Sequence, residues 1–324
     1  MQMQDVFRLY AEDLKQVKAY MESSLRSEVR LIPEIIRHII DSGGKRFRPL
    51  LLLAASDLCG YSGDRRYPLA TVIEFIHTAT LLHDDVIDEA DVRRGKASAN
   101  RVWGNAASVL VGDFLYSKSF RLLTEYGNLD IIRLLSTTSN IMSEGEVLQL
   151  LKRGDVSITE ADYLSIIDKK TAVLISAACA LGGHLGGVDP GMIEALARYG
   201  LGVGAAFQMT DDTLDYIARE DEFGKAIGKD LEEGKLTLPL IRTMAQGSKE
   251  EKTRMQTLLR KTARTPEDIG EIRALIGRYD GISYTLDKAA ALIVEARERL
   301  AVFPDTPQKR VLLTIADHIV ERKI

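Results

Sequence analysis

Apolar residues recur along most of the chain at the spacing of an α-helix. Five isoleucines between residues 32 and 40 follow this spacing, and residues 69–80 repeat it with Leu, Val, Ile and Ala. An α-helix turns once every 3.6 residues, so this spacing places apolar side chains on one face. Strict alternation of apolar and polar residues over the length of a strand is hard to find. The pattern therefore predicts an all-α protein.

Prolines and polar or glycine-rich stretches divide this pattern into about a dozen helices. Most of the eight prolines stand where the apolar period stops, as expected from their poor fit inside a helix. The expected breaks fall near 42–48, 59–66, 91–98, 127–130, 152–159, 186–191, 220–237, 246–249, 263–267 and 302–307. No repeat of 20–50 residues is visible. We expect a single domain over residues 1–324, a helical bundle packed around one core.

The composition is that of an ordinary globular protein. The 324 residues hold 43 Lys and Arg against 47 Asp and Glu, a net charge of −4, whereas nucleic-acid-binding proteins usually have a basic excess. Cys59 and Cys179 do not suggest a disulfide framework, which favours a cytoplasmic setting. The N-terminus does not resemble a signal peptide, and the apolar stretch 172–187 is too short to span a membrane. We therefore expect neither nucleic-acid binding nor a membrane-spanning segment.

Two aspartate clusters with the same spacing carry the main chemical information. They are Asp84, Asp85 and Asp88, and Asp211, Asp212 and Asp215. Each lies late in an apolar helical run, and residues i and i+4 of a helix share a face. A single cluster is also typical of a solvated helix end, but two indicate bound cations. Carboxylates without a Cys and His cluster favour Mg²⁺ or Mn²⁺ over zinc, and Mg²⁺ is usually shared with substrate phosphates.

Basic residues gather at four further places. They are Lys45, Arg46 and Arg48 in GGKRFRP, Arg93 and Arg94, Lys170 before Thr171, and Lys225, Lys229 and Lys235 in a glycine-interleaved stretch. Guanidinium groups, flexible glycine backbone and a helix N-terminus favour anion binding, although each group alone is also typical of a solvated surface. Together with the acidic clusters, they indicate a ligand whose phosphates are bound around metal ions. The long apolar helices between them indicate that the rest of the ligand is hydrophobic.

The motifs GGKRFRP, LLHDDVIDEADVRRG, KKT, FQMTDDTLDY and GKDLEEGK occur here in a fixed order. In these motifs the chain resembles the trans-prenyl diphosphate synthases from about residue 40 to 240, and HTATLLHDD is most similar to long-chain members such as octaprenyl diphosphate synthases. The resemblance implies an all-helical fold of the isoprenoid synthase type with a deep central cavity, usually in a homodimer. It also implies condensation of isopentenyl diphosphate with an allylic diphosphate, with two or three Mg²⁺ ions per site.

The resemblance also implies a role for each motif residue. The metal ligands would be Asp84, Asp85, Asp88, Asp211, Asp212 and Asp215. The allylic diphosphate would contact Arg93, Lys170, Thr171, Gln208, Lys225 and Lys235. Isopentenyl diphosphate would contact Lys45, Arg48, His77 and Arg94. The residues expected to act in the chemical step are Asp84, Asp85, Asp88, Lys170, Thr171, Gln208 and Asp211.

The expected reaction is ionisation, condensation and elimination. Breaking the allylic carbon–oxygen bond leaves a carbocation and a diphosphate, so the protein must neutralise the leaving group and exclude water. The oxygens of Thr171 and Gln208 would stabilise the cation, which the alkene of isopentenyl diphosphate attacks. The departing diphosphate would take the final proton. No side-chain nucleophile is needed.

Product length should depend on side chains that line a tunnel below Asp84. Ala79 and Thr80 lie five and four positions before Asp84 and are small, whereas short-chain members carry aromatic rings there. We expect the tunnel to pass Ala79 and to end near the apolar side chains Ile76, Phe120 or Leu123. The product would then be a long polyprenyl diphosphate made from farnesyl or geranylgeranyl diphosphate. The alternative is that Ala79 and Thr80 are simple packing residues.

Other functions fit parts of the sequence. A short-chain (C15–C20) synthase would share every motif. A terpene cyclase would not need the second diphosphate site of Lys45, Arg48 and Arg94. A helical metal-dependent phosphohydrolase would need more histidines beside acidic residues than the five in this chain provide. A non-catalytic partner subunit of a prenyl synthase would be expected to lose one of the aspartate clusters.

Overall fold

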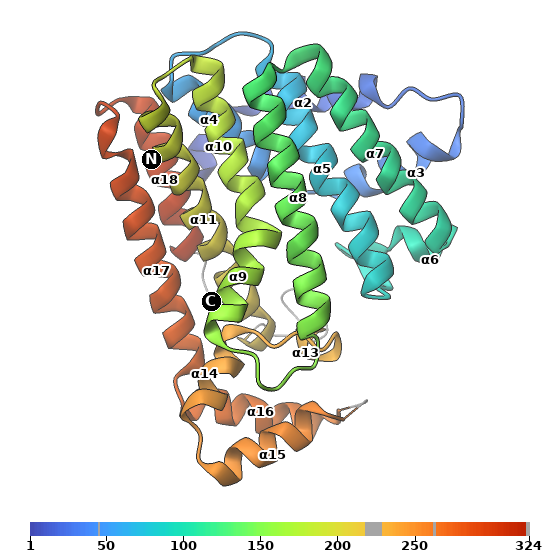
Figure 1. Ribbon diagram of the computed structural model, residues 1–324, viewed down its shortest axis with the longest axis vertical. Coiled ribbons are helices and arrows are strands. Elements are labelled where there is room, and N and C mark those ends of the chain that lie inside the picture. The colour runs from blue at the N-terminus through green and yellow to red at the C-terminus, as the bar shows by residue number, and fades with distance from the viewer. Residues whose placement is uncertain (45, 218–228, 262–263, 322–324) are drawn as a thin grey trace. The chain divides into compact units, whose positions relative to one another are not determined.

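The computed structural model describes residues 1–44, 46–217, 229–261 and 264–321 (Figure 1). Within these ranges the chain is almost entirely helical, and its only strands are β1 (Val92–Arg93) and β2 (Lys96–Ala97). The predicted all-α class is confirmed. None of the described helices combines the length and the apolar character that crossing a bilayer requires.

Helices follow one another with short connections. The first part of the chain forms α1 (Met3–Leu9), α2 (Ala11–Ser24), α3 (Leu31–Asp41), α4 (Phe47–Leu58), α5 (Arg66–Ile87), α6 (Ala99–Trp103), α7 (Asn105–Tyr126) and α8 (Leu129–Lys152). The second part forms α9 (Glu160–Ile167), the π-helix η1 (Asp168–Ala172), α10 (Val173–Gly186), α11 (Pro190–Ile217), α13 (Lys229–Glu232), α14 (Leu238–Gln246), α15 (Lys249–Leu259), α16 (Pro266–Arg278), α17 (Gly281–Arg299), the 3₁₀-helix η2 (Leu300–Val302) and α18 (Pro307–Glu321). The structure has more helices than the dozen predicted, because short helices such as α6 and α13 lack a readable apolar period.

The chain divides into two compact units. Unit 1 comprises Met1–Ser139, Leu174–Gly200 and Arg299–Ile315. Unit 2 comprises Asn140–Val173, Leu201–Glu298 and Ala316–Ile324. Each unit is described by itself below, and the single domain over residues 1–324 stays a prediction.

Helices α4 and α5 form the centre of unit 1. Residues 50–55 of α4 are completely buried, which is typical of a helix surrounded by other helices. Helix α5 packs along α7, and Gly112 of α7 leaves room for the His83 ring, since a Cβ there would lie 2.2 Å from His83 Nε2. The same ring nitrogen lies 3.1 Å from the carbonyl oxygen of Val109. His83 is therefore a packing residue between these helices.

The end of α5 is fixed by its backbone. Ala90 N–H donates to the carbonyl oxygen of Asp85 at 2.9 Å and Glu89 N–H donates to that of Val86 at 3.3 Å, with Glu89 at a φ of 50°. This is the Schellman arrangement that ends a helix. The chain then forms a hairpin between β1 and β2, whose turn residues Arg94 and Gly95 both have positive φ, as type I′ turns require. The hairpin, which the sequence pattern did not predict, brings Arg93 back to the end of α5.

Unit 2 has its own hydrophobic core. Its largest cluster contains Tyr216, Leu231, Leu236, Leu240, Met255, Leu258, Leu259, Ile272, Leu275 and Ile276. These residues come from α11, α14, α15 and α16 and from the segment around α13. The core therefore supports the C-terminal end of α11, where the second aspartate cluster lies.

Candidate active site

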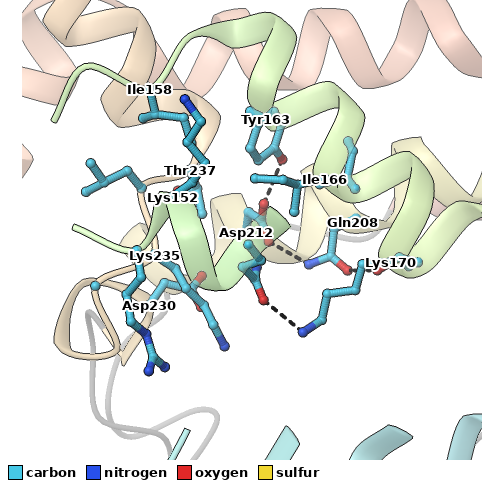
Figure 2. A pocket seen from close by; sticks show the side chains of 16 residues that line it. Lys152, Ile158, Tyr163, Ile166, Lys170, Gln208, Asp212, Asp230, Lys235 and Thr237 are labelled. Carbon is cyan, nitrogen blue, oxygen red and sulfur yellow. Dashed lines mark hydrogen bonds between the residues drawn. The ribbon is translucent and has the colours of Figure 1, made fainter. Parts of the chain in front are cut away.

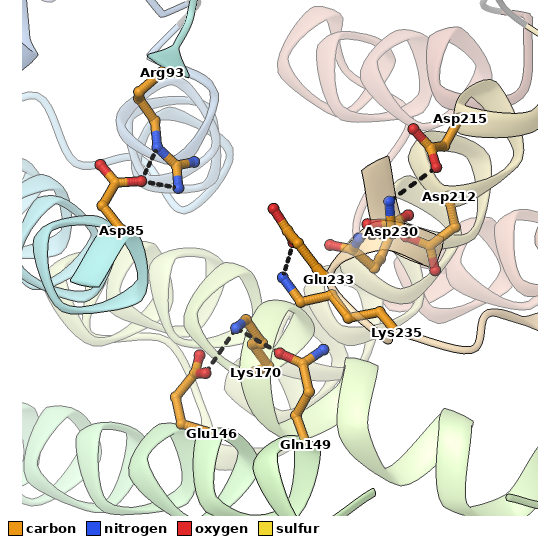
Figure 3. A network of polar contacts seen from close by, with 11 residues as sticks. Asp85, Arg93, Glu146, Gln149, Lys170, Asp212, Asp215, Asp230, Glu233 and Lys235 are labelled. Carbon is orange, nitrogen blue, oxygen red and sulfur yellow. Dashed lines mark hydrogen bonds and ion pairs between the residues drawn. The ribbon is translucent and has the colours of Figure 1, made fainter. Parts of the chain in front are cut away.

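The first aspartate cluster lies at the C-terminal end of helix α5. Asp84 and Asp85 lie in its last turn and Asp88 is its C-cap residue, which confirms the predicted helical placement. Asp85 is 2% exposed, and its Oδ1 accepts hydrogen bonds from Arg93 Nε at 2.7 Å and Nη2 at 2.5 Å (Figure 3). Asp84 and Asp88 are half-buried and lie one helical turn apart. Two carboxylates therefore share a helix face, while an arginine holds the third.

Two arginines connect the GGKRFRP motif with α5 and with the hairpin that follows it. Arg46 is the N-cap residue of α4 at a φ of 48°, and its guanidinium donates to Glu74 Oε2 at 2.7 Å and to the carbonyl oxygen of Ile40 at 3.2 Å. Arg94 donates to the carbonyl oxygen of Gly43. A Cβ at Gly44 would lie 2.8 Å from the Arg94 guanidinium, so this glycine lets the arginine approach the backbone. The motif and the hairpin are therefore one structural group within unit 1.

His77 is surrounded by positive charge. Burial lowers its pKa well below the usual 6.5, and four guanidinium groups lower it further, those of Arg48, Arg94, Arg93 and Arg46. Burial also lowers the pKa of Arg48 to about 10, and its Nε has no hydrogen-bond partner among the described residues. Such a group of partly desolvated cations around a neutral histidine is suited to a polyanion, which would accept their hydrogen bonds.

The residues predicted to set product length lie on α5 and α7. Ile76, Ala79 and Leu123 are buried, and Thr80 is half-buried with its hydroxyl donating to the carbonyl oxygen of His77 at 2.8 Å. Phe120 is 42% exposed. The buried positions are compatible with an apolar tunnel wall, whereas the exposure of Phe120 gives its predicted role no support within a single chain.

The second aspartate cluster contributes to a pocket in unit 2. Figure 2 shows this open pocket, which has a volume of about 120 Å³. Its lining includes Lys170, Thr171, Gln208, Asp212 and Lys235. These residues come from η1, from α11 and from the segment that follows α13. Five of the predicted site residues therefore share one space.

A chain of hydrogen bonds crosses this pocket. Thr171 Oγ1 donates to Gln208 Oε1 at 2.9 Å, and Gln208 Nε2 donates to Asp212 Oδ1 at 2.7 Å. Tyr163 OH donates to Asp212 Oδ2 at 2.6 Å (Figure 2). Because the carboxylate accepts from Nε2, the amide oxygen must face Thr171. The Thr171 hydroxyl hydrogen is committed to Gln208, so its oxygen presents lone pairs to any third group.

Two lysines of the pocket are held by acidic neighbours. Lys170 Nζ donates to Glu146 Oε2 at 2.6 Å and to Gln149 Oε1 at 2.8 Å, both on α8 (Figure 3). Lys235 Nζ donates to Glu233 Oε2 at 2.6 Å. These contacts fix the positions of two positive charges at the pocket.

Carboxylates crowd the end of α11. Asp211 is exposed, and half-buried Asp215 accepts a hydrogen bond from the Asp230 N–H at 3.1 Å (Figure 3). The pKa of Asp212 is raised to about 7, mainly by burial; the hydrogen bonds from Tyr163 and Gln208 lower it, and the charges of Asp211 and Asp215 raise it. Burial, and then the charges of Asp212 and Asp215, raise the pKa of Asp230 well above its usual range. This group would be stabilised by a bound cation.

The donor set at both clusters fits a hard divalent ion, since it consists of carboxylate oxygens. Within the described ranges, however, no three acidic, histidine or cysteine side chains already form a metal-binding group. In unit 1, Asp85 is turned toward Arg93, and in unit 2 both oxygens of Asp212 accept protein hydrogen bonds. Both clusters therefore have the donor chemistry that such an ion needs, although protein groups also bind Asp85 and Asp212.

The sequence missed three residues that hold this site, and two of its predictions lie outside the described residues. Lys45 and Lys225 belong to the latter. Tyr163, Asp230 and Glu74 were not predicted. Asp230 lies in the GKDLEEGK motif and was open to recognition, whereas Tyr163 and Glu74 act through partners 49 and 28 positions away and gave no local signal.

The comparisons with known proteins agree with these features. The family described as polyprenyl synthetase matches residues 29–276. Octaprenyl diphosphate synthase of Escherichia coli (strain K12) is 40% identical over 322 residues, with 99% of each chain covered. The crystal structure of a decaprenyl diphosphate synthase from Rhodobacter capsulatus superposes with a TM-score of 0.94 at 42% identity, covering 98% of both chains.

A second solved structure carries ligands. It is polyprenyl synthase from Caulobacter crescentus CB15, complexed with calcium and isoprenyl diphosphate, which is similar at a TM-score of 0.93 and 41% identity and covers 98% of this chain and 97% of that one. The fold and the matched motifs define a helical prenyltransferase. The chain belongs to the polyprenyl synthetase family.

Proposed function

We propose that this chain condenses isopentenyl diphosphate with an allylic diphosphate, farnesyl or geranylgeranyl diphosphate, to give a long-chain all-trans polyprenyl diphosphate. The observation that carries the proposal is the unit 2 pocket, whose lining combines Lys170, Thr171, Gln208 and Asp212. Similarity over nearly the whole chain to octaprenyl and decaprenyl diphosphate synthases supports the long-chain product.

In unit 2, we assign the pocket residues to the allylic substrate. Lys170 and Lys235 provide positive charge for the leaving diphosphate, and their acidic partners keep both ammonium groups in position. Thr171 presents oxygen lone pairs, because its hydroxyl hydrogen is committed to Gln208. An oxygen oriented in this way stabilises an adjacent allylic cation and does not capture it. Water, by contrast, would capture the cation.

For isopentenyl diphosphate, we assign Arg48, His77 and Arg94 of unit 1, together with Lys45. For the allylic diphosphate, we assign Arg93 of unit 1, together with Lys225. The unpartnered Nε of Arg48 and the low pKa of His77 support an anionic ligand at this group. A neutral His77 donates a hydrogen bond to a phosphate oxygen from one ring nitrogen.

We propose Mg²⁺, with Mn²⁺ as a substitute, as the metal, with two or three ions per site held by the two aspartate clusters. When bound, these ions supply Lewis-acid neutralisation of the phosphate oxygens. Burial and, after it, the repulsion between neighbouring carboxylates raise the pKa values of Asp212 and Asp230, and this repulsion supports a cation at the end of α11.

The test is a product analysis. The purified protein is incubated with Mg²⁺, labelled isopentenyl diphosphate and farnesyl diphosphate, and the dephosphorylated products are separated by length. We expect polyprenols of more than four isoprene units. Products that stop at C15–C20 would identify a short-chain synthase, a cyclic hydrocarbon would identify a terpene cyclase, and the absence of any product would leave the partner-subunit alternative.

We also propose that the chain forms a homodimer. Large apolar side chains are exposed around α7 in unit 1, namely Val102, Val109, Leu110, Phe120 and Leu129. Exposed apolar patches of this kind are typical of subunit interfaces. Leu110→Glu should therefore convert a dimer into a monomer in light scattering, whereas Val294→Glu, on the exposed face of α17, should not. A wild-type protein that is monomeric at micromolar concentration would contradict the proposal.

We propose a cytoplasmic location and one functional domain over residues 1–324. Two free cysteines, Cys59 half-buried and Cys179 buried, fit a reducing compartment. Two separate unfolding transitions in calorimetry would contradict the single domain, because each unit would then unfold independently.

A further inference from the structure

The segment that carries Lys170 and Thr171 is not an ordinary α-helix. Residues 168–172 form the π-helix η1 between α9 and α10, and the Val173 N–H donates to the carbonyl oxygen of Asp168, five residues back. A π turn holds more residues than an α turn and is wider, and such turns are rare and frequently lie at functional sites. The wider turn needs space on the neighbouring helices.

Gly145 of α8 supplies that space on one side. A Cβ at this position would lie 2.8 Å from Lys169 Cβ and 2.9 Å from the backbone nitrogen of Lys170. These distances are shorter than a Cβ atom tolerates, and one of the atoms belongs to the backbone of the π turn. An alanine here cannot be accommodated by a side-chain rotation alone.

Gly204 of α11 supplies the space on another side. A Cβ at this position would lie 2.6 Å from Ala172 Cα and 3.0 Å from Ala172 Cβ. Here too the nearest atom belongs to the main chain of the turn. The π turn therefore meets two glycines on two different helices.

Each glycine lies one helical turn before a residue that binds a side chain of the π turn. Gln149 follows Gly145 by four positions and accepts a hydrogen bond from Lys170 (Figure 3), while Gln208 follows Gly204 by four positions and accepts one from Thr171. Positions i and i+4 share a helix face. On both helices, the glycine lies close to the π turn, and the glutamine one turn later accepts a hydrogen bond from a side chain of that turn.

From this geometry we propose that Gly145 and Gly204 are positioning residues that accommodate the π turn and thereby set the positions of the Lys170 and Thr171 side chains at the pocket. The proposal rests on the proposed function, since it assigns those two side chains to the allylic substrate. Neither glycine is among the residues that line the pocket. Their effect on the reaction is therefore indirect.

The test replaces each glycine with alanine and uses Gly270→Ala as the matched control. Gly270 lies inside α16, in the same unit, and a Cβ there would meet nothing within 4 Å. We expect Gly145→Ala and Gly204→Ala to lower kcat about 10- to 100-fold, since small displacements of a catalytic group have effects of this size. The KM for isopentenyl diphosphate should stay within about twofold of wild type, because its assigned residues lie in unit 1.

Hydrogen–deuterium exchange of peptides covering residues 165–175 provides a readout that does not depend on activity. Both variants should exchange faster than wild type at the Val173 amide, and Gly270→Ala should match wild type in exchange and in kcat. Wild-type kcat and exchange in the two variants would overturn the proposal, as would an equal loss in Gly270→Ala.

Two further outcomes are assigned in advance. If both variants fail to fold while Gly270→Ala folds, the glycines serve the fold rather than the position of the turn, and the proposal is overturned. If only one of Gly145→Ala and Gly204→Ala folds, the kcat and the exchange of that variant decide whether the proposal holds. A wild-type protein without prenyl-transferring activity would overturn the proposed function, and the exchange measurement would still decide whether the glycines hold the π turn.

Discussion

The hydroxyl of Tyr163 lies 2.6 Å from Oδ2 of Asp212 and donates a hydrogen bond to it. Both residues are buried, at 3% and 6% exposure, and Gln208 occupies the other carboxylate oxygen. Asp212 therefore cannot rotate without breaking two hydrogen bonds in a poorly solvated place. Through Gln208, the same two bonds determine which way the Thr171 hydroxyl points.

Replacing Tyr163 with Phe should reduce both stability and turnover. The variant leaves one oxygen of a buried carboxylate without its donor, which costs about 1–3 kcal/mol. We expect the free energy of unfolding in urea to fall by that amount and kcat to fall about tenfold or more, because Asp212 and Gln208 lose their fixed orientation. The KM for isopentenyl diphosphate should be unaffected.

Tyr284→Phe is the matched control. Tyr284 also lies in unit 2 and donates from its hydroxyl to a carboxylate, that of Glu160, at 2.7 Å, but it does not line the pocket. The control should lose stability and keep kcat. Equal kcat values for Tyr163→Phe and Tyr284→Phe would show that the Tyr163 contact serves the fold alone.

The ion pair of Arg46 and Glu74 should be strongly coupled. Its side chains are 19% and 5% exposed and its atoms are 2.7 Å apart. Removing one partner of a buried pair leaves an uncompensated charge, at a cost of about 3–5 kcal/mol, whereas removing both costs less. A double-mutant cycle of Arg46→Met and Glu74→Gln, read by urea denaturation, should therefore give a coupling energy of about 3 kcal/mol or more.

The pair of Arg254 and Glu271 provides the comparison. It has a similar distance of 2.6 Å, but its side chains are 51% and 37% exposed. Exposed pairs couple by about 0–1 kcal/mol. Equal coupling in the two cycles would contradict the idea that burial makes the Arg46 contact a fixed part of unit 1.

The helical fold was predictable because its signal is local. The periodicity that places Ile35 and Ile39 on one face needs only a few neighbouring residues, and both are buried in α3. The β1–β2 hairpin was missed because two-residue strands leave no alternation to detect. The π turn was missed for a related reason. It adds one residue to a turn between two helices, α9 and α10, and no local pattern marks that residue.

The site was predictable where its residues act in a fixed local spacing. Both aspartate clusters lie at helix ends, whereas the contact of Thr171 with Gln208 joins residues 37 positions apart and has no local signal. As metal ligands, the sequence treated all three acids of each cluster alike, since spacing contains no information on tertiary partners. The structure shows that Arg93 binds Asp85 and that Tyr163 binds Asp212.

His77 should make the protein less stable in mild acid. Its pKa in the folded protein lies well below the value near 6.5 expected in the unfolded chain. Above pH 6.5 both states are neutral and no penalty exists. As the pH falls below 6.5, the unfolded chain gains a proton that the folded protein does not, so stability is lost at up to about 1.4 kcal/mol per pH unit. Urea denaturation between pH 7.5 and 5.5 measures this loss.

His77→Gln isolates the contribution of this residue. The variant lacks the titrating ring, so the stability of wild type relative to the variant should decrease as the pH falls from 7.5 to 5.5. Other groups titrate in the same range, including Asp212 with a pKa near 7, but they are common to both proteins. Parallel stability profiles for wild type and variant would contradict a neutral buried His77.

Ala79 lies on α5 one helical turn or more before the aspartates at its end, and it is completely buried. A tyrosine at position 79 would place an aromatic ring in the space that adjoins this part of α5. If the growing chain passes this position, the ring should stop elongation, because a packed interior has no room for both. If Ala79 is only a packing residue, the ring would lower stability and leave product length alone.

Ala79→Tyr should therefore shift the product distribution toward shorter chains, measured as the length of labelled products with farnesyl diphosphate as primer. A melting temperature close to wild type would exclude partial unfolding as the cause. Leu9→Ala serves as the comparison, because Leu9 lies on α1 in the same unit and is 60% exposed. We expect that variant to keep the wild-type product length. An unchanged product distribution in a folded Ala79→Tyr protein would mean that the chain does not grow past α5 at this position.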